Sequence, residues 1–412
     1  MRVAVIAHGH PEFSKGGAEI AARELWCAIE AQPEHQAWFI ARAPHSMLHL
    51  GTAVSAIGER EFLVAGDAGI EQLSATVALG DGSDFAALLR AIDPDVVHFH
   101  HYLFLGVEMI RAVRRACPRA RIVLTLHEYL AICRNAGQMV KTDGRLCQRY
   151  SPLACAQCFP DVSPEDVFLR ERYLKAHFAL VDAFVAPSRF LAERYAAWGL
   201  PAERIHVLEN GVRELPRLPP REPASGEPRG RFAYFGQINP FKGVDLVLEA
   251  FVSLPRALRR QASLDVFGSA LANQPEPYRQ RIAELLAADP QALHHHGPYE
   301  PGELPRLMQD IDWVVMGSVW WENSPLVIQE AHALGRPVLC PDIGGMAEKV
   351  EPGVGGFHYR ARDARSLATL MQRLLADPQA HADVCARLPV PRLRAAIVAE
   401  LLGLYAGERG DA

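Results

Sequence analysis

Short runs of apolar residues alternate with longer stretches of helical periodicity along the chain. The apolar runs lack the in–out alternation of a strand with one wet face, so we predict strands that are buried on both faces. In the first half, the predicted strands are Arg2–Ala7, Gln36–Ile40, Val96–Phe99, Arg121–Leu126, Ala183–Ala186 and Arg204–Leu208. The helices predicted between them are Ala18–Ala31, Phe85–Ile92, Leu105–Ala116 and Pro164–Leu180.

The second half repeats this pattern. Its predicted strands are Phe232–Phe235, Ser263–Phe267, Ala292–His295, Trp313–Met316 and Pro337–Cys340. Strands that alternate with helices predict βαβ units and parallel sheets. Because ligands of open parallel sheets bind beyond the carboxyl ends of the strands, we expect an α/β protein of two facing Rossmann-like domains with a cleft between them.

A proline-rich segment, 213–230, separates the two halves. Its helix- and strand-breaking residues are Pro216, Pro219, Pro220, Pro223, Gly226, Pro228 and Gly230. Such a composition is typical of a semi-rigid linker. We therefore predict domains at 1–212 and 231–390, followed by a helical tail at 391–412. The 412 residues are also more than one ordinary core holds.

Composition narrows the classes of function. With 49% apolar and 22% charged residues and a net charge of −5, the chain is predicted to fold and not to bind nucleic acid. No apolar run approaches the ~18 residues of a membrane-spanning helix. The first residues, Met1–Ala7, are typical of a buried strand rather than a signal peptide. Eight cysteines without a secretion signal favour a reducing compartment, so we expect a cytoplasmic protein.

Two glycine-containing turns are candidates for phosphate binding. Gly16-Gly17 opens a helix, where backbone amides can approach an anion, although a simple strand-to-helix turn looks the same. The second turn contains Gln237 and Lys242 ahead of a helix, and a lysine there can hold a diphosphate or merely be solvated. No Gly-x-Gly-x-x-Gly or Walker A motif is present, which disfavours a dinucleotide cofactor and an ATPase.

The segment 320–331 contains the strongest chemical signal. Asn323 or Ser324 is predicted to cap a helix whose first turn contains Pro325. Glu322 then precedes the helix and Glu330 lies within it. A purely structural helix has little need of tandem tryptophans and a carboxylate at its start.

The Glu-x7-Glu spacing of Glu322 and Glu330 resembles the signature of retaining glycosyltransferases of the GT-B fold, family four. Further matching segments occur in the expected order over nearly the whole chain. They are Gly16-Gly17, Thr125–Glu128, Pro187-Ser188, Asn210–Val212, Lys242-Gly243, Gly335–Val338 and Gly344-Gly345. The resemblance implies transfer of a sugar from a UDP- or GDP-sugar to a glycan or lipid-linked acceptor in polysaccharide or glycolipid biosynthesis.

The resemblance also implies roles for individual residues. Glu330 would bind the donor ribose, and Glu322 would face the transferred sugar. His127 would lie near the reactive face of the sugar, and Lys242 would hold the diphosphate with the Gly17 amide. The catalytic residues implied are therefore Glu322, His127 and Lys242. The remaining donor-binding residues implied are Gly16, Asn210, Gln237, Gly268, Gly297, Asn323, Ser324, Pro325 and Leu326.

Two positions depart from the family pattern. Gln237 stands where arginine is common, so Lys242 would supply the phosphate-binding charge alone. Glu128 stands where aspartate is common. Because no Asp-x-Asp follows a strand, we expect catalysis without a metal or other cofactor.

Two other functions remain open at this stage. A nucleotide-sugar 2-epimerase also uses two Rossmann-like domains. A non-catalytic, donor-binding subunit of a glycan assembly complex is suggested by Gln237. Basic residues from Arg111 to Arg121 are predicted to form a solvated face, which anionic lipid could also contact at the inner face of the cell membrane.

Four cysteines fall within an irregular insertion at 133–160. They are Cys133, Cys147, Cys155 and Cys158, and they end in a Cys-x2-Cys pair typical of zinc knuckles. We predict a structural zinc; the alternative is that these residues are small apolar groups packing a loop. His294, His295 and His296 are consecutive on a predicted strand, so we expect a structural or base-lining role rather than a metal site.

Overall fold

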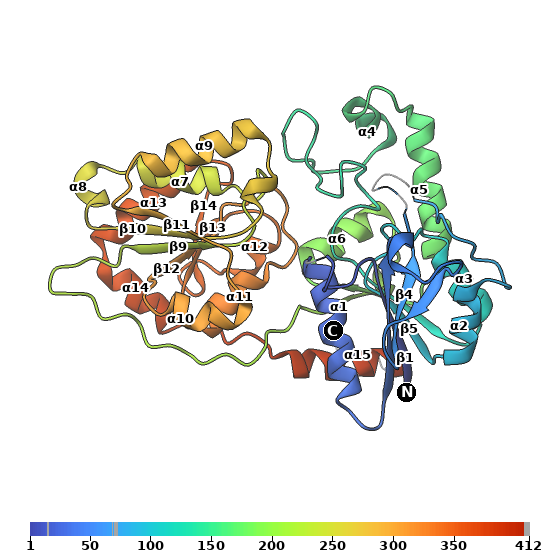
Figure 1. Ribbon diagram of the computed structural model, residues 1–412. Coiled ribbons are helices and arrows are strands. Elements are labelled where there is room, and N and C mark those ends of the chain that lie inside the picture. Colours follow the sequence, from blue (N-terminus) through green and yellow to red (C-terminus); the bar gives the residue numbers. More distant parts are fainter. Residues whose placement is uncertain (15, 68, 70–72, 408–412) are drawn as a thin grey trace. The chain divides into compact units, whose positions relative to one another are not determined.

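The computed structural model describes residues 1–407 apart from 15, 68 and 70–72. The chain forms two compact units (Figure 1): unit 1 is Met1–Asn210 with Ala395–Ala412, and unit 2 is Gly211–Arg394. Each unit is an α/β domain built on a mainly parallel sheet, as predicted. None of the helices in the described part of the chain has the length and apolar character needed to span a membrane.

Unit 1 contains an eight-stranded sheet in the order β3-β4-β2-β1-β5-β6-β7-β8. The strands are β1 (Arg2–Ala7), β2 (Gln36–Ala43), β3 (Val54–Ala56), β4 (Glu61–Ala65), β5 (Val96–Phe99), β6 (Arg121–Thr125), β7 (Ala183–Ala186) and β8 (Ile205–Val207). All pairs are parallel except β3 with β4. The six predicted strands are confirmed, whereas β3 and β4 were not predicted from the sequence.

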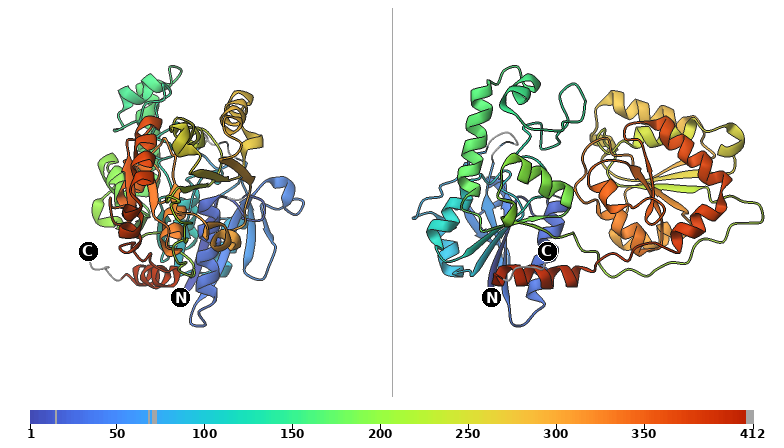
Figure 2. Two further views of the ribbon diagram at one scale, coloured as in Figure 1. Left: turned by 90° about the vertical axis from the view of Figure 1, so that its left-hand side faces the viewer. Right: turned by 180° about the vertical axis from the view of Figure 1, so that it is seen from behind.

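The helices of unit 1 cover both faces of this sheet. They are α1 (Gly17–Glu30), α2 (Asp84–Ile92), α3 (Met109–Ala116), α4 (Pro152–Cys158), α5 (Pro164–Phe178), α6 (Arg189–Trp198) and α15 (Arg394–Ala406), with the 3-10 turns His45–Met47 and Ala202–Arg204. Alternation along β1 directs Val3 and Val5 into a core that also contains residues of α1 and α15. Figure 2 shows α15 beside α1, so the C-terminal helix belongs to the first domain.

Unit 2 contains a six-stranded, all-parallel sheet in the order β11-β10-β9-β12-β13-β14. The strands are β9 (Arg231–Phe235), β10 (Ser263–Phe267), β11 (Leu293–Gly297), β12 (Trp313–Val315), β13 (Val338–Pro341) and β14 (Gly356–Tyr359). The five predicted strands are confirmed within a residue or two at each end, and β14 was missed.

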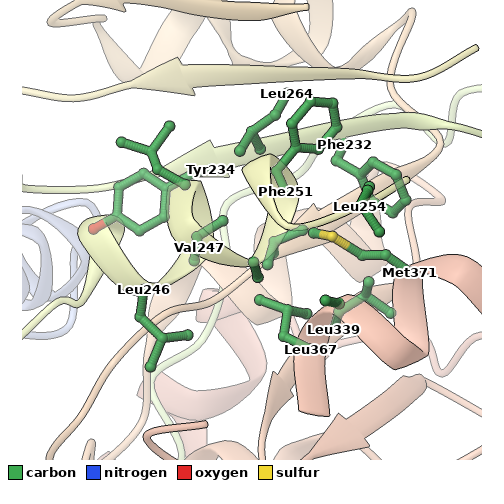
Figure 3. Packing of buried hydrophobic residues seen from close by; sticks show 14 of the residues in the cluster. Phe232, Tyr234, Leu246, Val247, Phe251, Leu254, Leu264, Leu339, Leu367 and Met371 are labelled. Atoms are coloured by element: carbon green, nitrogen blue, oxygen red, sulfur yellow. The ribbon is translucent and has the colours of Figure 1, made fainter. Parts of the chain in front are cut away.

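Helices also cover both faces of the second sheet. They are α7 (Val244–Val252), α8 (Arg256–Arg259), α9 (Glu276–Ala287), α10 (Leu304–Met308), α11 (Leu326–Ala333), α12 (Gly344–Lys349), α13 (Ala364–Ala376) and α14 (Pro378–Cys385), with the 3-10 turns Leu271–Asn273 and Pro301–Glu303. Figure 3 shows Phe251 of α7 near Phe232 of β9 and Met371 of α13 in one apolar core. Phe235 points to the opposite face, into a core shared with α10 and α11.

The proline-rich segment is packed into unit 2 and is not a separate linker. The Arg221 guanidinium pairs with Asp312 at 2.9 Å, and both side chains are buried. The fully buried Arg336 donates to the Pro219 carbonyl at 3.0 Å. Leu218 packs against the core that contains α11. The linker interpretation was therefore wrong, because the charged partners and carbonyl contacts of 213–230 come from distant parts of the sequence.

Candidate functional site

Two loops at the carboxyl ends of strands in unit 2 are in direct backbone contact. A Cβ atom on Gly243, which follows β9 and has φ 60°, would lie 2.1 Å from the Gly317 carbonyl oxygen. A Cβ atom on Gly317, which follows β12, would lie 2.3 Å from the Gly243 carbonyl oxygen. Only glycine fits at both positions. This approach brings Lys242 next to the segment 318–322.

The Glu322 carboxylate is the centre of this arrangement. Its Oε1 atom accepts hydrogen bonds from Lys242 Nζ at 2.6 Å, Ser318 Oγ at 2.7 Å and Trp320 Nε1 at 3.1 Å. Glu322 is 6% exposed, whereas the Lys242 side chain is 28% exposed. A buried carboxylate needs such partners, since desolvation without them is expensive. Two predicted catalytic residues are thus in contact, and Ser318 is a further member of the site that the sequence analysis missed.

A second pair of glycines supports the backbone of Glu322 and Asn323. A Cβ atom on Gly345 would lie 1.5 Å from the Asn323 carbonyl oxygen. The Gly345 amide donates to the Glu322 carbonyl at 2.8 Å, and Gly344 has φ 62°. The start of α12 therefore fixes the backbone position of the predicted donor-binding segment.

The predicted cap of the following helix is not observed. Helix α11 begins at Leu326 with Pro325 as its N-cap residue and no side-chain cap. Because Pro325 is extended, with ψ 118°, the helix starts too late for Asn323 or Ser324 to cap it. Ser324 is buried, and its hydroxyl has no hydrogen-bond partner among the residues that the structure describes. An unsatisfied buried hydroxyl beside Glu322 is a candidate contact for a polar ligand.

Aromatic rings gather at the carboxyl ends of the neighbouring strands. Phe267 stacks on Phe235 at 4.8 Å between ring centroids and on His296 at 4.5 Å. Tyr299 contacts Phe235 edge-on at 5.6 Å. Burial, together with the charge of Glu330, raises the pKa of Tyr299 above its usual value, so Glu330 lies within electrostatic range of these rings. This aromatic group was not predicted from the sequence.

The remaining predicted residues of unit 2 lie in the same loops. A Cβ atom on Gly268 would lie 2.2 Å from the Gly236 carbonyl oxygen, so the loops after β9 and β10 also touch. Gly297 has φ 80° and nothing within 4 Å of its Cβ position, which leaves open space beside it. Gln237 is exposed, and its carbonyl accepts a bond from the Tyr234 hydroxyl at 2.7 Å.

Two histidines of β11 share one carboxylate partner on the neighbouring strand β10. His294 and His296 both approach Asp265 Oδ1, at 3.4 and 2.6 Å. Neighbouring residues of a strand do point to opposite faces, but residues two apart share a face. Across the described residues, this is the one group of three potential metal ligands whose ligand atoms lie within 4.8 Å of one another.

In unit 1, the predicted anion site is the start of α1. Gly16 is the N-cap residue, and Gly17 is exposed with nothing within 4 Å of its Cβ position. The buried Glu19 carboxylate accepts from Ser14 Oγ at 2.9 Å and lies 3.4 Å from His8 Nε2. A Cβ atom on Gly16 would lie 2.3 Å from Glu19 Oε2. A carboxylate of the chain therefore lies against the helix start, a feature that the sequence analysis missed.

Buried histidines and the half-buried His127 line the carboxyl ends of β5 and β6. His127 is 3.1 Å from His100 between ring nitrogens, and their rings are stacked. His98 lies within hydrogen-bonding distance of Thr125 and of Tyr405 from α15. Burial lowers the pKa of His98 to about 3 and lowers the pKa of His127 well below its usual value. These imidazoles are neutral near pH 7.

Glu128, which departs from the family pattern, is half-buried beside His101. It lies 3.1 Å from His101, and burial raises the pKa of Glu128 to about 8. A Cβ atom on Gly137 would lie 1.8 Å from Glu128 Oε2, so a glycine of the insertion makes room for the longer side chain.

Asn210 and the basic segment from Arg111 to Arg121 were also singled out from the sequence. Asn210 is half-buried at the end of unit 1. Arg114, predicted to lie on a solvated face, donates to the Ala120 and Leu180 carbonyls and pairs with Asp182 at 2.6 Å. Its guanidinium therefore fixes the chain around β6, whereas Arg111, Arg115 and Arg119 are exposed, as predicted.

Each unit matches a model of a known protein family. Residues 15–214 match the family model described as Glycosyltransferase Family 4, and residues 220–387 match the model described as Glycosyl transferases group 1. The chain is 28% identical over 207 residues to the lipopolysaccharide 1,2-N-acetylglucosaminetransferase of Salmonella typhimurium, which covers 48% of this chain and 54% of that protein. It is 29% identical over 301 residues to the D-inositol 3-phosphate glycosyltransferase of Nocardia farcinica, which covers 69% and 59%. The matched stretches thus span less than two thirds of the length of these relatives.

Solved structures show the same fold. Anabaena Alr3699/HepE in complex with UDP and glucose superposes with a TM-score of 0.65 at 16% identity, over 99% of this chain and all of that one. Sucrose-phosphate synthase from Thermosynechococcus elongatus gives a TM-score of 0.70 at 18% identity, over 99% of both chains. Together with the two family models, the two parallel-sheet domains show that the chain belongs to the glycosyltransferases of the GT-B fold.

Proposed function

We propose that the chain transfers a sugar, with retention of configuration, from a UDP-sugar to a glycan or lipid-linked acceptor. The observation that carries this proposal is the ion pair of the half-buried Lys242 with the buried Glu322, beside the unsatisfied Ser324 hydroxyl. A cation, a fixed carboxylate and an unpaired hydroxyl suit a ligand that has both phosphate and sugar hydroxyl groups.

The donor would be held by the loops at the carboxyl ends of the unit 2 strands. Glu330 would bind the ribose hydroxyls, and the aromatic group around Phe267 would lie near the base. We propose UDP rather than GDP because the solved structure of Alr3699/HepE is a complex with UDP and glucose. A lipid-linked acceptor would bring the reaction to the inner, cytoplasmic face of the cell membrane. Such an acceptor is suggested by the Salmonella relative and by the structurally similar galactosyltransferase WaaB, both of which are named for lipopolysaccharide.

The chemistry follows from where charge develops. As the bond between sugar and diphosphate breaks, negative charge grows on the leaving diphosphate. Lys242 and backbone amides near Ser324 would stabilise that charge, and one preorganised donor of this kind is worth about 3–4 kcal/mol. We propose that this set replaces a divalent cation.

Glu322 would orient the sugar rather than attack it. Its Oε1 atom already accepts three hydrogen bonds, which lowers its nucleophilicity. The acceptor hydroxyl would then attack from the side on which the diphosphate leaves, and its proton would pass to the departing phosphate oxygen. The neutral His127 imidazole would contact a hydroxyl of the transferred sugar.

A donor screen tests this proposal. Purified protein is incubated with a panel of UDP- and GDP-sugars, with and without a lipid and glycan fraction, while released nucleotide is measured. We expect release of UDP that depends on the acceptor, and a product whose anomeric configuration matches the donor by NMR.

The other candidate functions give different results. Conversion of the donor alone to an isomeric nucleotide-sugar would indicate an epimerase. Tight donor binding without turnover on any acceptor would indicate a non-catalytic subunit. A product of inverted configuration would refute retention while leaving transfer intact.

A further inference from the structure

Four cysteines of unit 1 line a single cavity in the insertion that follows β6. Cys133, Cys147, Cys155 and Cys158 all border this cavity, whose empty space is about 600 Å³ including solvent at its mouth. Figure 1 shows the insertion leaving the sheet of unit 1, with α4 beside α5. The chain thus brings together cysteines that are up to 25 positions apart in sequence.

Met139 and Val140 of the insertion are buried, but residues 141–160 have no hydrophobic core of their own. None of the residues 141–160, all of which the structure describes, is buried. Leu153 of α4 is 71% exposed. A segment of this size that buries so little apolar surface usually needs a cross-link or a metal.

Local structure presents three of the four thiols from two small elements, and Cys133 lies in the chain before the first of them. A tight hairpin joins Met139 to Cys147, with the Cys147 amide donating to the Met139 carbonyl at 2.8 Å. Ser151 caps α4, which carries Cys155 and Cys158. Residues three apart lie on one face of a helix, so these two side chains are directed to the same side.

Basic side chains share the cavity with the four thiols. Four basic side chains border the same cavity: Arg134, Lys141, Arg149 and Arg170. A metal held by four thiolates has a net charge of about −2, and surrounding cations stabilise such a charge.

We propose that Cys133, Cys147, Cys155 and Cys158 bind one structural zinc ion that holds the insertion together. Four thiols would each lose a proton to solvent, and the resulting thiolates would bind Zn²⁺ tetrahedrally at about 2.3 Å. Binding would draw the sulfur atoms closer together than they lie around the cavity. Such a shift would involve residues 141–160, none of which is buried. With four protein ligands, the ion has no open position for catalysis.

Zinc binding would also affect the surroundings of Glu128. The insertion contributes Gly137, which lies against the Glu128 carboxyl group, and Glu128 in turn contacts His101. Loss of the ion would loosen the chain that encloses Glu128. The proposal does not depend on which sugar the protein transfers.

Metal analysis of freshly purified protein tests the proposal, with variants that separate the two candidate metal sites. The test variant is Cys155→Ser/Cys158→Ser. The controls are Cys27→Ser, which removes an exposed thiol, and His294→Gln/His296→Gln, which removes the histidines beside Asp265. We expect about one zinc per chain in wild type and both controls, and less than about a tenth in the test variant.

Several results would overturn the proposal. Zinc that survives in the cysteine variant but is lost in the histidine variant would place the ion at Asp265. Wild type with no zinc and four reactive thiols would exclude a metal, and iron with sulfide would indicate a cluster.

A second measurement uses wild-type protein and so tests the proposal even if the cysteine variant fails to fold. Wild type prepared with Co²⁺ should show thiolate-to-cobalt charge-transfer bands and the intense visible bands of a tetrahedral ion. Cobalt protein without these bands would contradict four-thiolate binding.

Discussion

The Lys242–Glu322 pair offers the sharpest physical test of the site. Lys242→Met keeps most of the length of the side chain and removes its charge. Glu322 would then be a buried carboxylate with only Ser318 and Trp320 as donors. Glu322→Gln removes the opposite charge and leaves Lys242 partly in contact with water.

The exposure of the two side chains sets the expected size of the effect. Removing one partner of a fully buried ion pair costs about 3–5 kcal/mol. Because the Lys242 side chain is 28% exposed, solvent screens the pair, and we expect Lys242→Met to lower the unfolding free energy by about 2 kcal/mol. The double variant should be more stable than the sum of the single effects by about 1–2 kcal/mol.

Differential scanning calorimetry measures these changes, since the two units can unfold in separate transitions. A loss of about 2 kcal/mol in a unit of this size corresponds to about 4–8 °C in Tm. The surface pair Arg306–Glu303, with side chains 72% and 44% exposed, is the matched control in the same unit. Arg306→Met and Glu303→Gln should show a coupling near zero. If the coupling of Lys242 with Glu322 is no larger than that of the surface pair, the ion pair does not organise the site.

Three further predictions follow from the same structure. Gly345→Ala should displace the Glu322-Asn323 backbone and lower the free energy of unfolding by about 1–3 kcal/mol. Gly302→Ala, with open space around its Cβ position, should be neutral, so equal Tm values of the two variants in calorimetry would contradict the packing argument. Unfolded His98 takes up a proton below about pH 6.5, whereas folded His98 does so only near pH 3. This group should therefore lower the free energy of unfolding, measured with urea, by about 2 kcal/mol at pH 5 relative to pH above 7. A His98→Gln variant whose stability falls with pH as steeply as that of wild type would refute that origin. Transfer should persist in EDTA; a loss that magnesium or manganese restores would show that a divalent ion is required.

Much of the fold followed from the apolar runs of the sequence. β1, β5, β7 and β10 have the predicted bounds because each run is uniformly apolar or is closed by turn residues. β14 was missed because its four residues, Gly356–Tyr359, include glycine and histidine. Its burial comes from pairing with β13, which no local pattern reveals.

The candidate site could be predicted as a list of residues but not as a geometry. The resemblance named Lys242 and Glu322, which are 80 positions apart, yet their contact depends on the glycine-to-glycine approach of two loops. Similarly, the partners of Arg221 and Arg336 lie far along the chain, so composition alone suggested a linker at 213–230. Local periodicity predicts elements, whereas these contacts are set by tertiary packing.

The most direct test of the account compares donor binding and turnover in Glu322→Gln and Glu330→Gln, with Glu303→Gln as an exposed control. UDP-sugar affinity is measured by calorimetry, and turnover by nucleotide release. We predict that Glu330→Gln weakens donor binding by about 10-fold or more. Glu322→Gln should bind the donor within about threefold of wild type but turn it over at least about 100-fold more slowly. Near-normal binding and turnover in both variants would contradict the assignment of the donor site to unit 2.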